Sequence, residues 1–147
     1  MSMEKLLISA CLLGERCRYD GGTNALPEAL LAALRESYEL LPVCPERDGG
    51  MPTPRIPSER RGGAVVNRAG EDVTAYFARG AELAVQKAAG CACRLALLKE
   101  RSPSCGSGLI YDGSFTGTLV DGYGLAAERL TAAGVAVFGE SRVKELL

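Results

Sequence analysis

The hydrophobic positions of this sequence fall into short continuous runs separated by segments with helical spacing. Four apolar runs have the length of a strand, and they cover residues 5–11, 38–44, 95–98 and 135–138. Continuous apolar runs, unlike alternating ones, are typical of parallel strands that are covered on both faces. Pro42 lies inside the second run and cannot donate a hydrogen bond to a neighbouring strand. We therefore expect this strand at an edge of the sheet.

Apolar residues at helical spacing fill most of the segments between these runs. Pro27 begins a leucine-rich helix, a long helix runs from Asp72 or Thr74 to about Ala89, and residues 124–133 form the last helix. Strands that alternate with helices are typical of layered α/β proteins. The sequence therefore predicts an α/β, three-layer Rossmann-like fold with a mostly parallel sheet of about four strands.

Three further segments depart from this alternation. Residues 45–62 are rich in proline and glycine, which predicts an irregular loop, and a long loop inside a compact domain is more often functional than idle. Residues 65–66 and the turn at 68–70 predict a short hairpin, and residues 109–120 predict a small β excursion. No internal repeat or linker interrupts the sequence, so we expect a single domain over residues 1–147.

Composition narrows the classes of function. The chain of 147 residues is 47% hydrophobic and 24% charged with a formal net charge of −1, as in ordinary soluble globular proteins. It has no long basic run that would recruit nucleic acid or an anionic membrane. No apolar stretch approaches the length of a membrane span, and the first one is too short for a secretion signal. We expect a cytoplasmic protein with no membrane partner and no nucleic-acid partner.

Three of the six cysteines follow predicted strands. Cys11 ends the first strand, Cys44 ends the second, and Cys105 lies in a Ser/Gly-rich loop just after the third. Ligand sites of open α/β sheets form outside the carboxyl ends of the strands, so these three thiols are expected at one site. Cysteine is also a small hydrophobic residue that suits a strand end. Three cysteines at equivalent positions nevertheless favour a shared site.

The sequence contains no histidine, which excludes mixed Cys/His zinc sites and every histidine-based nucleophile. In a cytoplasmic protein, cysteines that bind metal, act in catalysis or are buried are more common than disulfides. Iron–sulfur clusters normally take four cysteines. Three cysteines on a four-iron cluster leave one iron without a protein ligand, and such an iron is a Lewis acid that accepts a soft sulfur atom.

The remaining cysteines are expected to be mainly structural. Cys91 and Cys93 flank a turn at Gly90, at the opposite end of the sheet from the proposed site. Cys17 lies in the loop six residues after Cys11, which makes it the best candidate for a fourth ligand, although a structural position is favoured.

Two alternatives to a catalytic cluster stay open. One is a structural metal-binding module, which requires a fourth protein ligand such as Cys17. The other is a thiol-dependent enzyme with Cys105 as the nucleophile. A cysteine nucleophile needs a depressed pKa, which Arg101 or a helix N-terminus would have to provide.

Polar residues near these cysteines are the candidates for catalysis and binding. Glu46 lies two residues after Cys44, and Pro45 restricts the backbone between them, so Glu46 is a candidate general base. Its alternative is a solvated loop residue or a helix-cap partner. The loop after Cys11, the proline-rich loop and the Ser/Gly-rich loop contribute the candidate substrate-binding residues, which are Tyr19, Asp20, Asn24, Arg55 and Ser104.

Six motifs in order along nearly the whole chain carry a family resemblance. They are SACLLG (9–14), CRYDG (17–21), PVCPE (42–46), GMPTPR (50–55), DVT (72–74) and KERSPSCG (99–106). Together they resemble a small bacterial family of thiouracil desulfidases.

The resemblance implies a 4Fe–4S cluster held by Cys11, Cys44 and Cys105. It implies an open fourth iron that takes the sulfur of the substrate, which gives a 4Fe–5S intermediate. It also implies that Glu46 and Ser102 are catalytic, with Ser104 as the alternative serine.

The implied reaction is the non-redox conversion of 2-thiouracil to uracil and hydrogen sulfide. The implied partners are a small thiolated nucleobase or nucleoside and the iron–sulfur assembly machinery.

Overall fold

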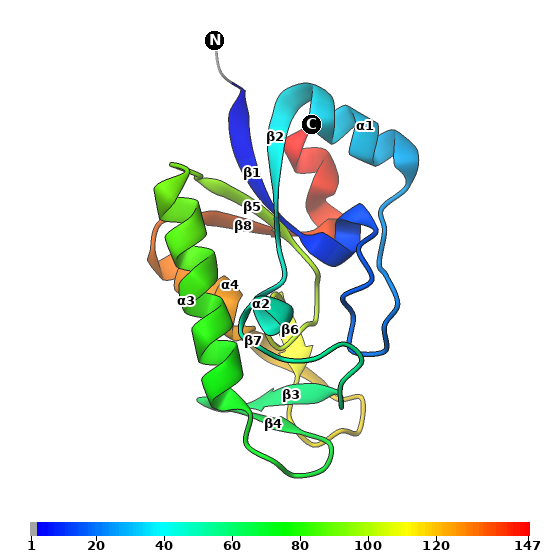
Figure 1. The fold of residues 1–147 in the computed structure, drawn as a ribbon, viewed down its shortest axis with the longest axis vertical. Coiled ribbons are helices and arrows are strands. Elements are labelled where there is room, and N and C mark those ends of the chain that lie inside the picture. The colour runs from blue at the N-terminus through cyan, green and yellow to red at the C-terminus, as the bar shows by residue number, and fades with distance from the viewer. Residues whose placement is uncertain (1–2) are drawn as a thin grey trace.

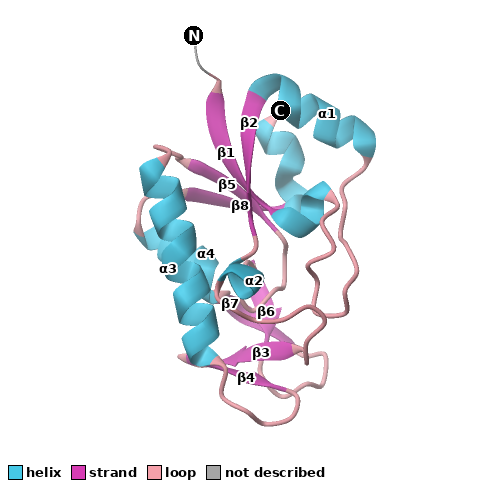
Figure 2. Cartoon of the chain, in the orientation of Figure 1, coloured by secondary structure: helices cyan, strands magenta, loops and turns pink. Residues whose placement is uncertain are grey.

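A computed structural model describes residues 3–147, which form a parallel sheet with helices on both faces and two small hairpins below it in the view of Figure 1. Figure 2 shows the same view coloured by secondary structure. The strands are β1 (Glu4–Ser9), β2 (Tyr38–Val43), β3 (Ser58–Arg61), β4 (Ala64–Asn67), β5 (Leu95–Leu98), β6 (Ser107–Tyr111), β7 (Leu119–Tyr123) and β8 (Ala136–Gly139). The helices are α1 (Glu28–Ser37), α2 (Pro45–Asp48), α3 (Thr74–Gly90) and α4 (Leu125–Ala132), with 3-10 segments η1 (Ala10–Leu13) and η2 (Glu140–Leu146).

The main sheet has the strand order β2-β1-β5-β8, and all of its neighbouring strands are parallel. This confirms the predicted α/β fold with a four-stranded parallel sheet. β2 lies at an edge, as Pro42 predicts, because only one side of this strand has to donate and accept hydrogen bonds. The four strands coincide to within a few residues with the four continuous apolar runs.

Both faces of the sheet are covered, which explains why its strands are continuously apolar. Leu6 and Ile8 point to one face and pack with Leu34 of α1 and with η2. Leu7 points to the other face and packs with residues of α3 and α4, among them Leu130. Successive strand residues face opposite sides of a sheet, so a strand between two helical layers needs apolar residues at every position.

The segment 45–62 is more regular than expected. Its first residue, Pro45, begins the short helix α2, because the fixed φ of proline suits the first helical position. Its last residues form β3, which pairs antiparallel with β4 across the turn at Gly62 and Gly63.

The turn predicted at 68–70 also closes, as a short antiparallel contact. Val66 bridges Asp72, and the amides of Asn67 and Val73 donate to the carbonyls of Glu71 and Val65, each at 2.9 Å. The regular strand partner of β4 is nevertheless β3, which the sequence does not predict.

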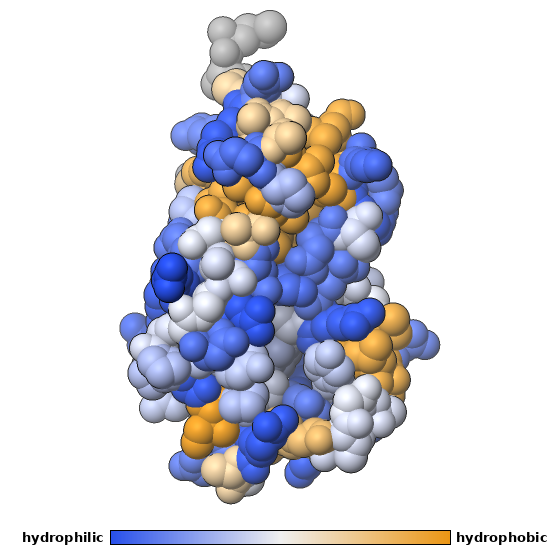
Figure 3. Space-filling model, turned by 90° about the vertical axis from the view of Figure 1, so that its right-hand side faces the viewer, coloured by the Kyte–Doolittle hydropathy of each residue, from blue (hydrophilic) through white to orange (hydrophobic). Residues whose placement is uncertain are grey.

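The remaining elements agree well with the sequence. β6 and β7 form the predicted β excursion as an antiparallel pair, and α1, α3 and α4 lie within a few residues of their predicted bounds. No helix within residues 3–147 combines the length and the hydrophobicity needed to cross a membrane. In the face drawn in Figure 3, hydrophobic residues gather in the upper half and the lower half is mostly hydrophilic.

Candidate active site

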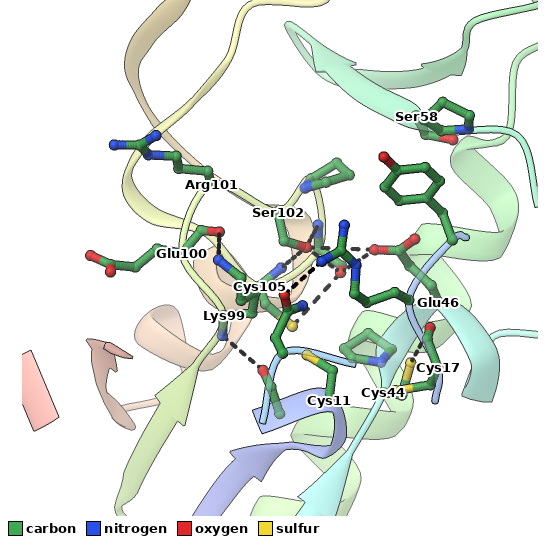
Figure 4. A pocket seen from close by; sticks show the side chains of 18 of the residues that line it. Cys11, Cys17, Cys44, Glu46, Ser58, Lys99, Glu100, Arg101, Ser102 and Cys105 are labelled. Carbon is green, nitrogen blue, oxygen red and sulfur yellow. Dashed lines mark hydrogen bonds between the residues drawn. The ribbon is translucent and has the colours of Figure 1, made fainter. Parts of the chain in front are cut away.

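The three predicted cluster ligands converge on one cavity at the carboxyl edge of the sheet. Cys11 lies on η1 directly after β1, Cys44 lies between β2 and α2, and Cys105 lies between β5 and β6. Because β2, β1 and β5 are adjacent and parallel, their carboxyl ends meet. All three cysteines line a cavity of about 560 Å³, and Cys17 lines it as well. Figure 4 shows these four side chains around the cavity.

The cysteines of this cavity suit an iron–sulfur cluster. All six cysteines of the chain are free thiols. Within residues 3–147, no group of three or more His, Cys, Asp or Glu side chains is arranged around a single metal ion. A single zinc ion needs its sulfur ligands about 2.3 Å from one centre, whereas each cysteine of a 4Fe–4S cluster binds its own iron. Several cysteine thiols that line one cavity are the donors that such a cluster takes.

The thiols of this cavity differ in acidity. A hydrogen bond from the Cys17 thiol is the main cause that lowers the pKa of Cys11 to about 7, and burial opposes it. The same donor lowers the pKa of Cys44. The pKa of Cys17 is raised because its thiol donates to both of these sulfurs. Cys17 is therefore the donor, and Cys11 and Cys44 are the acceptors, in this group of three cysteines.

Cys105 lies in a different environment. Burial raises the pKa of this thiol to about 12, although hydrogen bonds with Ser9 and Ser104 oppose the effect. A cysteine nucleophile requires the opposite, a depressed pKa and access to solvent. The structure therefore disfavours Cys105 as a nucleophile. A metal-bound cysteine loses its proton when the metal binds, so a buried Cys105 remains suitable as a ligand.

Glu46 lies in the first turn of α2 and lines the cavity between Cys44 and the serine loop. Its carboxylate Oε1 accepts a hydrogen bond of 3.1 Å from Arg55 Nε, and its Oε2 accepts one of 2.8 Å from Ser104 Oγ. The Ser102 hydroxyl is 3.5 Å from the same Oε2. Figure 4 shows Glu46 and Ser102 facing each other across the cavity. This geometry suits a carboxylate that exchanges protons with groups in the cavity.

The serine loop is held by its own backbone. Ser102 Oγ accepts hydrogen bonds of 3.1 Å from the backbone amides of Ser104 and Cys105, and it lies 2.9 Å from Ser104 Oγ. The Gly106 amide closes the turn on the carbonyl of Ser102 at 2.9 Å. These bonds fix Ser102 and Ser104 beside Glu46, and they place the Cys105 thiol against the sheet.

The other predicted binding residues divide into two groups. Tyr19 and Asn24 line the cavity, and Asn24 Oδ1 accepts a hydrogen bond of 3.0 Å from Arg18. Asp20 and Arg55 do not line it. Asp20 accepts a hydrogen bond of 2.9 Å from the amide of Gly22 and thereby holds the loop that carries Tyr19.

The outer wall of the cavity contains residues that the sequence reasoning missed. These are Arg18, Glu59, Arg68, Lys99, Tyr111 and Phe115. Phe115 has a φ of +60°, and Glu59 Oε1 accepts hydrogen bonds of 3.0 and 3.1 Å from the amides of Gly113 and Phe115. The glycine-rich turn at 112–117 is the sequence signal for this wall. Glu59, which holds the turn, lies on β3, in a segment whose sequence predicts an irregular loop.

The fold and this cavity define a class of protein, an open α/β protein with a cysteine-lined ligand site at the carboxyl edge of its parallel sheet. The chain belongs to the 2-thiouracil desulfurase family, whose model matches residues 6–142. The membership confirms the family resemblance of the sequence motifs.

Two relatives cover nearly the whole chain. A Bacillus subtilis (strain 168) protein described as uncharacterized protein YbbK is 38% identical over 152 residues, which cover 97% of this chain and 99% of that protein. The solved structure of the 4Fe–4S-dependent thiouracil desulfidase TudS is 49% identical with a TM-score of 0.93. The match covers 97% of this chain and 95% of TudS. The fold and the type of reaction expected from the sequence agree with the family and with the structure of TudS.

Proposed function

We propose that this protein converts 2-thiouracil to uracil and hydrogen sulfide with a 4Fe–4S cluster that Cys11, Cys44 and Cys105 hold. The observation that carries the proposal is the convergence of these three thiols and the Glu46 carboxylate on one cavity. Membership of the 2-thiouracil desulfurase family and the similarity to TudS support thiouracil desulfuration with an iron–sulfur cluster.

When bound, a cluster with three cysteine ligands supplies one iron without a protein ligand, which is a Lewis acid for the sulfur of the substrate. The protein contributes the placement of its thiols. Each thiol follows a different strand of one rigid sheet, so their relative positions are fixed before a ligand enters. Tyr19 and Asn24 line the same cavity and are the proposed contacts of the pyrimidine ring.

Glu46 is the proposed general base. Its carboxylate accepts a proton from a water whose oxygen adds to the ring carbon that carries the sulfur. The oxygen stays on that carbon, and both hydrogens of the water leave with the sulfur as hydrogen sulfide. No electron is gained or lost, so the reaction is hydrolytic. A well-placed base contributes about 10²–10⁴-fold to the rate.

Ser102 is the proposed proton carrier between Glu46 and the leaving sulfur. Its oxygen already accepts two backbone hydrogen bonds, so its own hydrogen is free to point to Ser104 Oγ or to a group in the cavity. The 3.5 Å between Ser102 Oγ and Glu46 Oε2 is short enough for a small movement to connect them.

The partners and the location follow from the same chemistry. A net charge of −1 favours a free thiolated base or nucleoside over intact nucleic acid as the substrate. We propose that iron–sulfur assembly machinery inserts the cluster. Six free thiols suit the reducing conditions of the cytoplasm, which is the proposed location.

The experiment that tests the proposed function measures uracil and sulfide released from 2-thiouracil by the reconstituted protein. Glu46→Gln is expected to keep the cluster and to lower kcat by at least about 10²-fold. Glu82→Gln is the matched control, because Glu82 lies on α3 and its carboxylate accepts a hydrogen bond from the exposed Gln86. Unchanged kcat in Glu46→Gln would show that Glu46 is not the base.

A further inference from the structure

The Arg55 guanidinium is buried, and all of its hydrogen bonds are internal. Its side chain is only 5% exposed, and its Nε donates to Glu46 Oε1 at 3.1 Å. One terminal nitrogen donates to the carbonyl of Pro52 at 3.2 Å and to Thr53 Oγ1 at 3.1 Å. The other donates to the carbonyl of Cys17 at 2.9 Å. These bonds use four of the five N–H donors of the guanidinium, so little capacity is left for a ligand.

Arg55 also connects three segments that surround the cavity. Its side chain joins α2 to the loop that carries Cys17, and its backbone amide donates to the carbonyl of Tyr19 at 2.7 Å. Two of these segments carry proposed cluster or substrate contacts, yet Arg55 itself does not line the cavity. It therefore lies behind the residues that face the substrate.

The second oxygen of Glu46 is held from the opposite side. Ser104 is 2% exposed, and its hydroxyl donates to Glu46 Oε2 at 2.8 Å. Ser102 Oγ, at 3.5 Å, lies outside ordinary hydrogen-bond distance of this oxygen. Each oxygen of the carboxylate thus has one close partner, Arg55 on Oε1 and Ser104 on Oε2. Two donors on opposite sides fix both the position and the plane of the carboxylate.

We propose that Arg55 and Ser104 are positioning residues that clamp the two oxygens of the Glu46 carboxylate, Arg55 from behind the cavity and Ser104 from its wall, where it also lies 3.7 Å from Cys105 Sγ, and that neither binds the substrate. The inference rests on the proposed function, in which Glu46 is the general base. Glutamate has three rotatable side-chain bonds, and a misplacement of about 1 Å at a reacting group costs about 10²-fold in rate. The clamp supplies the fixed geometry that a general base needs.

A clamp and a substrate contact have different kinetic signatures. Loss of a residue that binds the substrate weakens binding and raises KM. Loss of a residue that only positions the base lowers kcat and leaves binding unchanged. A residue that acts only through Glu46 also has no further effect once Glu46 has been replaced.

The test uses Arg55→Met, Arg55→Lys and Ser104→Ala in the reconstituted protein, each alone and combined with Glu46→Gln. Arg47→Met is the matched control, because Arg47 also lies on α2 but is 41% exposed and pairs with Glu15 at the surface. The readouts are iron and acid-labile sulfide per chain, kcat, KM, and the dissociation constant of 2-thiouracil in the Glu46→Gln background, where turnover is slow.

The clamp predicts full iron content in all variants and an unchanged control. It predicts a fall in kcat of about 10²-fold for Arg55→Met, with KM changed less than about threefold. Lysine keeps the charge but not the planar fork, so Arg55→Lys is expected to recover part of the loss. In the Glu46→Gln background, Arg55→Met and Ser104→Ala are expected to change neither kcat nor the dissociation constant by more than about threefold.

Three results would overturn the clamp: a KM or dissociation constant that rises tenfold with kcat retained, effects that persist in the Glu46→Gln background, or loss of iron. If Arg55→Met does not fold, Arg55→Lys and Ser104→Ala decide by the same criteria. A wild-type protein that holds its cluster but releases no sulfide would contradict the proposed function itself, and the clamp with it. That result is visible without any variant, so the two failures are distinguishable.

Discussion

Gly80 in α3 is the position where one added methyl group tests how the active site is held. The backbone of α2, which carries Glu46, lies directly against this glycine. A Cβ on Gly80 would stand 2.5 Å from the carbonyl carbon of Pro45 and 3.0 Å from its Cα. The nearest atom of all is the Pro45 carbonyl oxygen, and ordinary contact begins at 3.4 Å, so Gly80→Ala forces α2 and α3 apart by more than roughly 1 Å.

The energy of this substitution has two opposing parts. Alanine inside a helix is normally more stable than glycine by about 0.5–1 kcal/mol. Overpacking of a close contact costs about 1–3 kcal/mol, and the atoms that Gly80 meets are backbone atoms that cannot rotate away. We expect the free energy of unfolding to fall by about 0.5–2 kcal/mol. We also expect kcat to fall by about 10²-fold, because Glu46 is displaced together with α2.

Urea unfolding of the cluster-free protein measures the first effect, and sulfide release by the reconstituted protein measures the second. Gly90→Ala is the matched control, since Gly90 ends the same helix and a Cβ there would meet nothing within 4 Å. The control is expected to keep full activity and equal or higher stability. A Gly80→Ala protein as stable and as active as wild type would refute the reasoning.

Two further predictions concern stability. Ala92 is exposed and has a φ of 53°, a conformation that costs a non-glycine residue about 1–2 kcal/mol. Ala92→Gly is therefore expected to raise the free energy of unfolding, measured by urea unfolding, by about 0.5–1 kcal/mol. A decrease would contradict this prediction. Burial acts to raise the pKa of Glu100, but hydrogen bonds from the Ser141 hydroxyl and amide outweigh it and leave that pKa below its ordinary 4.5. A depressed pKa stabilises the fold above pH 4.5, and that stability is lost as the pH falls further. In the cluster-free protein, Glu100→Gln should therefore make the free energy of unfolding fall less steeply as the pH drops below 4.5. An unchanged pH dependence would argue against this role of Glu100.

The sheet and the meeting of the three cysteines were predictable because both depend on local pattern. A buried parallel strand needs apolar residues on both faces, so each strand is visible as a continuous run such as 95–98. Once the strands are placed, parallel topology brings their carboxyl ends together, and with them Cys11, Cys44 and Cys105. The same cysteines are expected from the family resemblance, and their role as ligands remains a prediction.

The surroundings of Glu46 were not predictable because they depend on contacts between irregular segments. Nothing periodic in the proline-rich loop indicates that Arg55 turns back to Glu46 nine residues earlier. β3 carries Ser58, Glu59, Arg60 and Arg61 with no apolar alternation, so the strand itself has no sequence signal, and the glycines of the 112–117 turn do not indicate that Glu59 holds it. Cys17 was favoured as structural, and the structure places it on the cavity beside Cys11 and Cys44.

The most direct test of the three-cysteine cluster is the amount of iron and acid-labile sulfide per chain after anaerobic reconstitution. Wild type is expected to bind four irons per chain. Cys11→Ser, Cys44→Ser and Cys105→Ser are each expected to abolish or strongly reduce the bound iron. Cys91→Ser is the control, since Cys91 packs with the core at the far end of the sheet. Cys17→Ser is expected to keep four irons, because Cys17 is not a proposed ligand. Iron lost in Cys17→Ser, or iron retained after loss of Cys11, Cys44 or Cys105, would contradict a cluster with three cysteine ligands and an open iron.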